Sequence, residues 1–274
     1  MKLKSLTSKI EIFYEKYLAR VEKGYLLKYH FIYKNYLRLV KNFRFSSKIP
    51  NKIPWMNTAL KSREDVNLAI KIIEASKLNL HPNIPEKNWD SLIALKIITQ
   101  ITNSSAKILD AGGEMNSSIL FWLYQLGFSN LKCLNLNFKK RIKRGRIEFI
   151  PGDLTITPFP NNYFDVVTCI SVIEHGVNEE KYFKEMNRIL KKGGLLITST
   201  DYWEIKIEPG GKLAHNNPIF IYDKESVKKL LNNAFKSNFR LFGPEIDLSC
   251  QDKVVNWKKA NLEFTFLIFC LQKM

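Results

Sequence analysis

The stretch ILDAGG, from Ile108 to Gly113, is a short apolar run that breaks into two glycines. Helical spacing of apolar residues resumes between Ser117 and Leu126, so a strand, a tight turn and a helix N-terminus follow one another. Glycine admits backbone conformations that a side chain forbids, and a helix N-terminus directs unpaired N–H groups outward. In open α/β sheets ligands bind at the carboxyl ends of the strands. The stretch therefore predicts a ligand site at its turn, although the full G-x-G-x-x-G phosphate fingerprint is absent.

Further strands and helices are predicted on both sides of this stretch. The helices are expected at Glu64–Leu78, at Glu179–Leu190 and at Lys224–Ala234. A further helix is expected to begin at about Trp89 and to lead to the ILDAGG strand. The other strands are expected at Leu131–Leu136, Ile147–Ile150, Asp165–Ile170, Leu195–Thr200, Phe239–Phe242 and Glu263–Leu271. Strands separated by helices or crossovers indicate an α/β fold with a doubly wound, mostly parallel sheet, here of seven strands. The connection before Ile147 is too short for a full crossover helix.

Residues 1–85 differ in composition from the rest and are predicted to be a basic, aromatic-rich helical extension of a domain at 86–274. Residues 1–50 hold twelve Lys or Arg against three Glu, and ten Phe or Tyr. A helix is expected between Gly24 and Phe45, with basic and apolar residues on different sides: Lys34, Arg38 and Lys41 against Tyr29, Ile32, Tyr36, Val40 and Phe43. Such a helix either docks on an acidic membrane surface or partner, or caps the catalytic domain or a second subunit.

The net charge of +17 raises the question of nucleic-acid binding. The chain has 34 lysines against 9 arginines, and arginine is the better bidentate reader of phosphate. We therefore expect the charge to serve solubility or contact with an anionic membrane rather than nucleic acid. Even the run KKRIKRGR, residues 139–146, is most simply a solvated charge run, although its place beside the ligand edge would favour an anionic substrate group.

The four cysteines lie far apart and form no C-x-x-C pair, which predicts reduced thiols and no metal site. The N-terminus lacks the apolar core of a secretory signal, and the run from Phe264 to Leu271 is too short to cross a bilayer. We expect a cytoplasmic protein that is soluble or peripheral to a membrane.

Two blocks in register carry a family resemblance: GDLTITPFPNNYFDVVTCISVIEHG (152–176) and EMNRILKKGGLLITST (185–200). Together with ILDAGG they resemble the adenine-site, fourth-strand, fifth-strand and first motifs of class I S-adenosylmethionine-dependent methyltransferases of the methyltransferase type 11 group. The resemblance covers roughly residues 89–274. It implies a Rossmann-like fold and S-adenosyl-L-methionine as the cofactor.

The resemblance also implies the cofactor-binding residues. Asp110 would orient the methionine ammonium group, and Gly112 would let the backbone approach the cofactor. Asn135 stands where the family has an acid that grips the ribose, and Asp153 matches the carboxylate that accepts the adenine amino group. The other residues implied at the cofactor are Ala111, Gly113, Leu154, Cys169, Ile170 and Ser171.

Two departures from the family pattern leave a second hypothesis open. The family motif Asp-x-Gly-x-Gly-x-Gly is met only at Asp110 and Gly112, with Glu114 and Asn116 at the later glycine places. Asn135 is a neutral acceptor, and the loss of charge assistance costs roughly 1 kcal/mol. The alternative is therefore a catalytically weak or inactive scaffold.

Methyl transfer from a sulfonium is an in-line displacement, so positioning and exclusion of water are the main requirements. For a hydroxyl acceptor, His175 in the family's Glu-His turn is the first candidate base, unless it is a turn histidine bonded to backbone. His215 is the second candidate base, in the long segment from Asp201 to Tyr222. In the same segment Trp203 could stack on a sugar or pack under a lid, and DYWEIKIEPGG loosely resembles bacterial methyltransferases of surface-saccharide clusters.

The leading hypothesis is methyl transfer to an oxygen or nitrogen atom of a small-molecule or saccharide-type acceptor. An RNA methyltransferase is a further alternative, favoured by the charge and by KKRIKRGR. Against it, CISV at 169–172 replaces the Asn/Asp-Pro-Pro-aromatic tetrad of many nucleic-acid enzymes.

Overall fold

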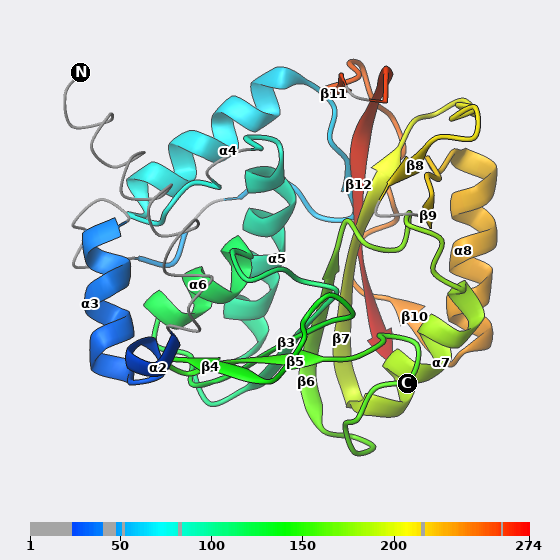
Figure 1. Ribbon diagram of the computed structural model, residues 1–274. Helices are drawn as coiled ribbons and strands as arrows, with labels where there is room; N and C mark the ends of the chain where they lie inside the picture. Colours follow the sequence, from blue (N-terminus) through cyan, green and yellow to red (C-terminus); the bar gives the residue numbers. More distant parts are fainter. Residues whose placement is uncertain (1–23, 41–47, 51–52, 82–83, 215–216, 259) are drawn as a thin grey trace.

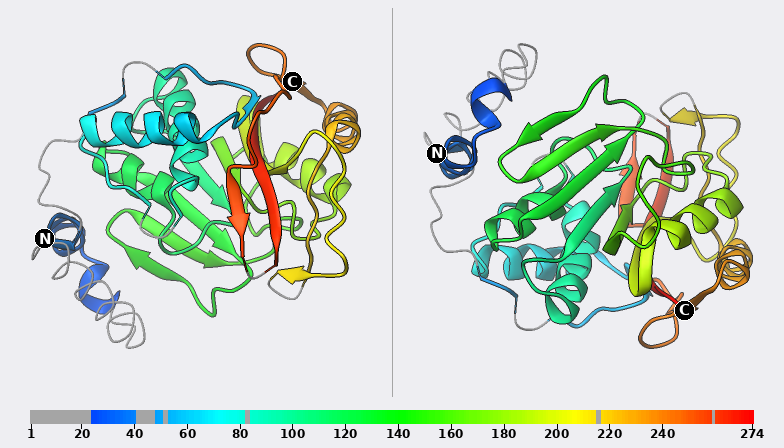
Figure 2. Two further views of the ribbon diagram at one scale, coloured as in Figure 1. Left: turned by 90° about the horizontal axis from the view of Figure 1, so that it is seen from above. Right: turned by 90° about the horizontal axis from the view of Figure 1, so that it is seen from below.

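The computed structural model describes residues 24–40, 48–50, 53–81, 84–214, 217–258 and 260–274. Its centre is a mixed ten-stranded sheet with helices packed on both faces (Figures 1 and 2). One face is covered by α4, α5 and α6, and the other by α7 and α8. The helices are α2 (Gly24–Leu27), α3 (His30–Val40), α4 (Arg63–Ala75), α5 (Lys87–Ile101), α6 (Ser118–Gln125), α7 (Glu179–Ile189) and α8 (Lys224–Lys236).

Seven strands form the body of the sheet in the order β5-β3-β2-β6-β7-β12-β10. Their bounds are β2 Lys107–Ala111, β3 Asn130–Asn135, β5 Ile147–Pro151, β6 Phe164–Ile170, β7 Leu190–Tyr202, β10 Phe239–Leu241 and β12 Leu262–Lys273. Neighbours from β5 to β7 are parallel, whereas β12 is antiparallel to both β7 and β10. The predicted doubly wound α/β fold is therefore confirmed.

Three short strands extend the predicted sheet from seven strands to ten. They are β1 (Thr58–Ala59) and β11 (Val255–Trp257), both antiparallel to β12, and β4 (Ile142–Arg144), antiparallel to β5. The described residues between β3 and β5 contain no helix, as the short connection predicted, and part of KKRIKRGR forms β4 instead. A separate two-stranded hairpin consists of β8 (Leu213–Ala214) and β9 (Asn217–Pro218).

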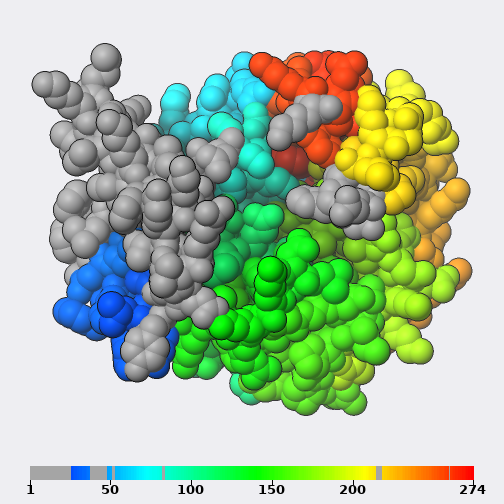
Figure 3. Space-filling view, viewed as in Figure 1, coloured from blue at the N-terminus to red at the C-terminus, as the bar shows by residue number. Residues whose placement is uncertain are grey.

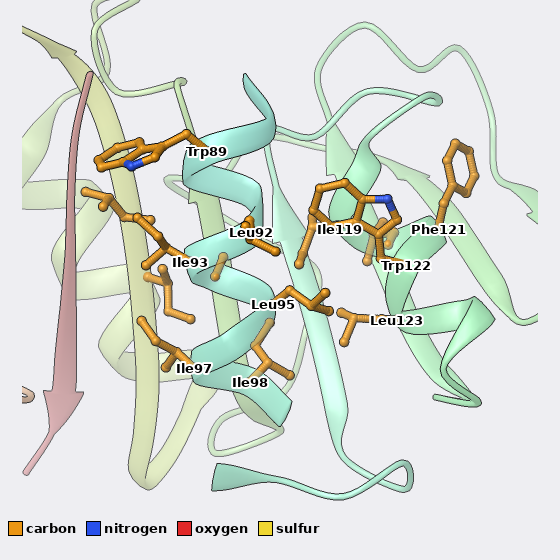
Figure 4. Close-up of a cluster of buried hydrophobic side chains, with 14 of the residues drawn as sticks. Trp89, Leu92, Ile93, Leu95, Ile97, Ile98, Ile119, Phe121, Trp122 and Leu123 are labelled. Atoms are coloured by element: carbon orange, nitrogen blue, oxygen red, sulfur yellow. The ribbon is translucent and has the colours of Figure 1, made fainter. Parts of the chain in front are cut away.

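Helix α5 is buried on two sides, which explains why its apolar residues follow no single stripe. In Figure 4, Trp89, Ile93 and Ile97 lie on the side of α5 that faces the sheet, and Leu92 lies toward α6. All four are fully or almost fully buried. The packing fixes the start of α5 over the strands that end near the glycine turn.

The N-terminal helices pack against the sheet domain, so one face of α3 caps that domain. Of the predicted apolar residues, Ile32 and Tyr36 are partly buried against the core, whereas Tyr29 is exposed. Tyr33 and Leu37 are buried in the main core, the N–H of Gly145 donates to the carbonyl of Leu27 at 3.1 Å, and Tyr124 Oη lies 2.5 Å from His30 Nδ1. Figure 3 shows these helices in blue against the green segment. Membrane docking through this helix stays a prediction, and the predicted helical residues beyond position 40 lie outside the described part.

Residues of α4 share the main hydrophobic core with α5 and α6, and β1 joins the sheet itself. The division of the chain after residue 85 stays a prediction, although the structure places part of the predicted extension in the core of the domain. None of the helices in the described ranges has the length and hydrophobicity needed to span a bilayer.

Candidate functional site

A cavity of about 720 Å³ lies over the carboxyl ends of β2, β3, β5, β6 and β7. Two halves can be distinguished by the elements that line them. We call the half beside the glycine turn, β3 and β5 the cofactor half. We call the half beside the start of α5, the end of β7 and the β11–β12 hairpin the acceptor half. A volume of this size is in the range of pockets that enclose small organic ligands.

The glycine turn tolerates no side chain at either position. Gly112 has a φ of +85°, and a Cβ there would lie 2.5 Å from Val172 Cγ1. A Cβ on Gly113 would lie 2.0 Å from Asp110 Oδ2. The N–H of Gly112 also donates to the carbonyl of Leu134 at 2.7 Å, which ties the turn to β3. The turn therefore brings bare backbone to the cavity wall.

Asp110 is held rigidly at the end of β2. Its side chain accepts hydrogen bonds from Ser117 Oγ at 2.6 Å and from Thr168 Oγ1 at 2.8 Å, and the residue is 2% exposed. Burial raises the pKa of Asp110, against the lowering effect of the two hydroxyls. Thr168 stands opposite Asp110 in the parallel register of β2 and β6. A threonine within the apolar run of β6 was the sequence signal for this partner, which the prediction missed.

Asn135 lines the cavity, but its side chain braces the glycine turn. Its Nδ2 donates to the carbonyl of Gly112 at 2.9 Å and to that of Gly113 at 3.0 Å, while its Oδ1 accepts from the N–H of Asn137 at 2.8 Å. Both amide hydrogens are thereby used within the protein. The predicted contact with the ribose through Asn135 has only the remaining lone pair of Oδ1 available.

Asp153 follows β5 between two residues that line the cavity, Gly152 and Leu154, but does not line it itself. Its Oδ1 accepts from the N–H of Thr155 at 2.7 Å and from Thr155 Oγ1 at 2.8 Å. The Oδ1 atom of Asp153 is thus used to stabilise the local turn at Thr155. The predicted role of Asp153 at the adenine stays a prediction, with Oδ2 as the oxygen that would fill it.

The cofactor-binding residues predicted near the end of β6 fall into two groups, those that line the cavity and those that do not. Ile170 and Ser171 line the cavity, whereas Cys169, like Ala111 of β2, is fully buried in the core beneath it, so a side-chain contact with the cofactor is not supported for these two. Ser171 has a φ of +50°, and its Oγ is buried without a hydrogen-bond partner among the described residues. Strained backbone and an unpartnered hydroxyl are features of ligand sites.

The acceptor half holds two carboxylates that the sequence prediction did not assign to the site. Glu174, 1% exposed, and Asp201, 5% exposed, both line the cavity. Thr200 Oγ1 donates to Glu174 Oε2 at 3.2 Å, whereas no hydrogen bond reaches the Asp201 carboxylate from the described residues. Glu174 follows β6 and Asp201 lies near the end of β7, so the rule that adjacent parallel strands place ligand residues at one edge could have found both.

A third carboxylate stands behind these two, on the first turn of α5. Asp90 is fully buried and accepts from Ser199 Oγ at 2.8 Å and from the N–H of Ser91 at 2.7 Å. Burial raises the pKa of all three carboxyl groups, and the neighbouring Glu174 raises that of Asp201 further. The nearby charge of Lys87 lowers all three pKa values, but by less than burial raises them.

The predicted catalytic residues have different outcomes. His175 lines the cavity, and its backbone N–H donates to the carbonyl of Val172 at 3.1 Å. His215 lies outside the described residues. Trp203 does not line the cavity and has Lys253 Nζ 5.2 Å from its ring centroid, so sugar stacking is not supported. No described residue of KKRIKRGR lines the cavity either.

A family model described as "Methyltransferase domain" matches residues 118–198. The tRNA U34 carboxymethyltransferase of Campylobacter fetus subsp. fetus (strain 82-40) is 26% identical over 175 residues, 60% of this chain and 61% of that protein. The ubiquinone/menaquinone biosynthesis C-methyltransferase UbiE of Shewanella sp. (strain ANA-3) is 27% identical over 93 residues, 34% of this chain and 36% of that protein. The chain thus spans less than two thirds of the length of either relative.

Among solved structures, geranyl diphosphate C-methyltransferase from Streptomyces coelicolor A3(2) superposes with a TM-score of 0.51 at 11% identity. The match covers 88% of this chain and 98% of that one. At this identity the similarity supports the fold alone.

Proposed function

We propose that this chain, which carries a class I S-adenosylmethionine-dependent methyltransferase domain, transfers a methyl group to an oxygen or nitrogen atom of a small organic acceptor. The observation that carries the proposal is the position of Asp110 and the bare glycine turn at one half of a cavity whose other half is open to a second reactant.

The residues present fit S-adenosylmethionine in the cofactor half. Asp110 is an oriented carboxylate for the ammonium group, and Ser171 Oγ is a buried hydroxyl that has no hydrogen-bond partner in the described part of the chain. Leu154 and Ile170 provide apolar wall, and Asp153 Oδ2 is the acceptor that we assign to the adenine amino group. The bound cofactor supplies an electrophilic methyl group on a sulfonium sulfur.

The chain's own contribution is orientation, exclusion of water and removal of a proton. The β11–β12 hairpin lines the acceptor half with Phe264, Phe266 and Trp257, an apolar surface from which a bound acceptor would displace water. For a hydroxyl acceptor we assign the proton to His175, since imidazole titrates near neutral pH.

Two alternative functions are less well supported. The cavity is lined by Glu86, Asp110, Glu114, Glu174 and Asp201 against one lysine, Lys87, and carboxylates repel the phosphates of RNA. That a relative carries the name of a tRNA-modifying enzyme is the observation that favours RNA. Against the loss of cofactor binding in an inactive scaffold, Glu114 and Asn116 at the missing glycine places line the cavity without filling it.

The first experiment is isothermal titration with S-adenosylmethionine and S-adenosylhomocysteine. We expect one site for each on the wild-type protein and loss of the binding heat in Asp153→Ala. The control is Asp165→Ala, which lies at the start of β6, at the other edge of the sheet from the cavity. Methyl-labelled cofactor and fractionated lysate then show whether label enters metabolites, saccharide, lipid or RNA. Absence of cofactor binding would overturn the proposal. Label in RNA alone would favour the RNA methyltransferase.

A further inference from the structure

The two carboxylates of the acceptor half, Glu174 and Asp201, are not needed to bind the cofactor. Asp110 is the carboxylate beside the glycine turn, and it is already placed for the cofactor. Glu174 and Asp201 lie beside Lys87 and the aromatic residues of β12. We call the three acidic residues Glu174, Asp201 and Asp90 the carboxylate wall; Asp90 stands behind the other two.

The carboxyl groups of the carboxylate wall receive few hydrogen bonds from the described protein. Asp90 has two donors, Ser91 and Ser199, and Glu174 has Thr200, but the Asp201 carboxylate receives no hydrogen bond from the residues that the structure describes. A nine-tenths buried carboxylate without a donor is costly unless a ligand supplies one. Asp201 lines the cavity, so a bound molecule can reach it.

Aromatic side chains line the cavity beside these carboxylates, and Phe266 of β12 is the cross-strand neighbour of Asp201 of β7. Phe264 and Phe266 of β12 and Trp257 of β11 line the same half of the cavity. Phe266 already receives a cation, because Lys87 Nζ lies 4.6 Å from its ring centroid. Carboxylates next to aromatic faces form an environment in which proteins bind ammonium groups. Burial raises the pKa of these carboxyl groups, and a cationic ligand beside them would favour their ionised forms.

We propose that the acceptor half binds a protonated amine, with Glu174 and Asp201 around its ammonium group and Phe264, Phe266 and Trp257 along its apolar body. Asp90 is a positioning residue, since it stands behind Glu174 and Asp201 and does not line the cavity. The inference rests on the proposed function, because it names the class of acceptor that the methyltransferase site takes. For methylation at this nitrogen the ammonium group must first pass one proton to the carboxylate of Glu174 or Asp201, since only the neutral amine has a lone pair for the methyl group. It excludes carboxylate- and phosphate-bearing groups from the position beside Asp201.

A matched series of three aromatic probes tests the charge requirement: phenethylamine, phenethyl alcohol and phenylacetate. Each is titrated by calorimetry into the full chain saturated with S-adenosylhomocysteine. We expect phenethylamine to bind at least about tenfold more tightly than phenethyl alcohol, and phenylacetate to bind more weakly than either. Equal affinity of the amine and the alcohol would overturn the proposal.

Variants then assign the preference to the wall. Glu174→Gln and Asp201→Asn, singly and together, are expected to remove the preference for the amine, while Glu225→Gln on the exposed face of α8 keeps it. A preference that survives in the double variant contradicts the proposal. Circular dichroism and S-adenosylhomocysteine binding check that each variant is folded. Should a variant not fold, the three-probe comparison on the wild-type chain decides.

Two further readouts separate this inference from the proposed function. If the wild-type chain binds no S-adenosylhomocysteine, the proposed function fails, and the probe series on the ligand-free chain still tests the amine site. If Glu174→Gln weakens binding of S-adenosylmethionine but not of S-adenosylhomocysteine, the carboxylates serve the sulfonium charge, and the amine site is overturned while the cofactor assignment stands.

Discussion

The hydroxyl of Ser199 donates a hydrogen bond of 2.8 Å to Asp90 Oδ2 and joins the end of β7 to the first turn of α5, across 109 residues of sequence. Both residues are fully buried. The bond therefore fixes the distance between the strand that carries Asp201 and the helix that carries Lys87, which are two walls of the acceptor half.

Removal of this hydroxyl should destabilise the fold. Ser199→Ala leaves a buried carboxylate with one acceptor unpaired, which costs on the order of 1–3 kcal/mol of the free energy of unfolding. The control is Ser105→Ala, whose hydroxyl bonds to Asn103 at an exposed site. Urea unfolding of both variants checks the prediction, and an equal, small loss in both would contradict it.

The glycine turn should be intolerant of alanine for a reason that goes beyond backbone strain. Gly112 and Gly127 both have positive φ, of +85° and +94°, but a Cβ meets Val172 at Gly112 and nothing within 4 Å at Gly127. We expect Gly112→Ala to weaken S-adenosylhomocysteine binding by roughly tenfold or more, since it displaces a wall of the cavity. Gly127→Ala should lose stability only. Calorimetry on the two variants measures this difference, and equal affinity would show that Val172 moves aside.

Replacing Asn135 by the acid that the family has at this place should not improve cofactor binding. In Asn135→Asp the carboxylate would face the carbonyl oxygens of Gly112 and Gly113, to which the amide now donates. Lost donors and repulsion should distort the turn and weaken S-adenosylhomocysteine binding by roughly tenfold. Asn137→Asp, at the exposed rim of the same cavity, is the control for added charge. Tighter binding by Asn135→Asp would show that the side chain turns toward the ribose.

Stability should fall with rising pH through the titration of Glu174. Burial raises the pKa of Glu174 from its ordinary value of 4.5 to about 7, against the lowering effects of Lys87 and Thr200. Between these two values the folded state holds a proton that the unfolded state has released, so each rise in pH favours unfolding. Glu174→Gln, which cannot ionise, should therefore be more stable than the wild type at about pH 8, by on the order of 1–3 kcal/mol, and gain less at about pH 5. Urea unfolding at both pH values checks this, with Glu225→Gln expected to show no such change; a gain that does not grow with pH would contradict it.

The predicted elements of the sheet domain depend on local chemistry, and most were located from the sequence. Apolar runs of strand length and the glycines after Ala111 determine their own backbone within a few residues. The short connection that holds KKRIKRGR excluded a crossover helix by its length alone. The family resemblance further identified Asp110 and the glycine turn, and the structure places both at the cavity.

The carboxylate wall and the use of Asn135 were decided only by the tertiary structure. The alternation of a strand determines which face a side chain occupies, but not which distant donor stands opposite it. Asp90 has a distant partner, Ser199, which comes close only when α5 packs over β7. Asn135 could face a ribose or a carbonyl from its place on β3, and the path of the glycine turn decides between them. Sequence patterns determined where the chain turns and which edge binds a ligand, whereas packing between distant elements decided which polar groups remain for that ligand, because hydrogen bonds depend on distances that no local pattern contains.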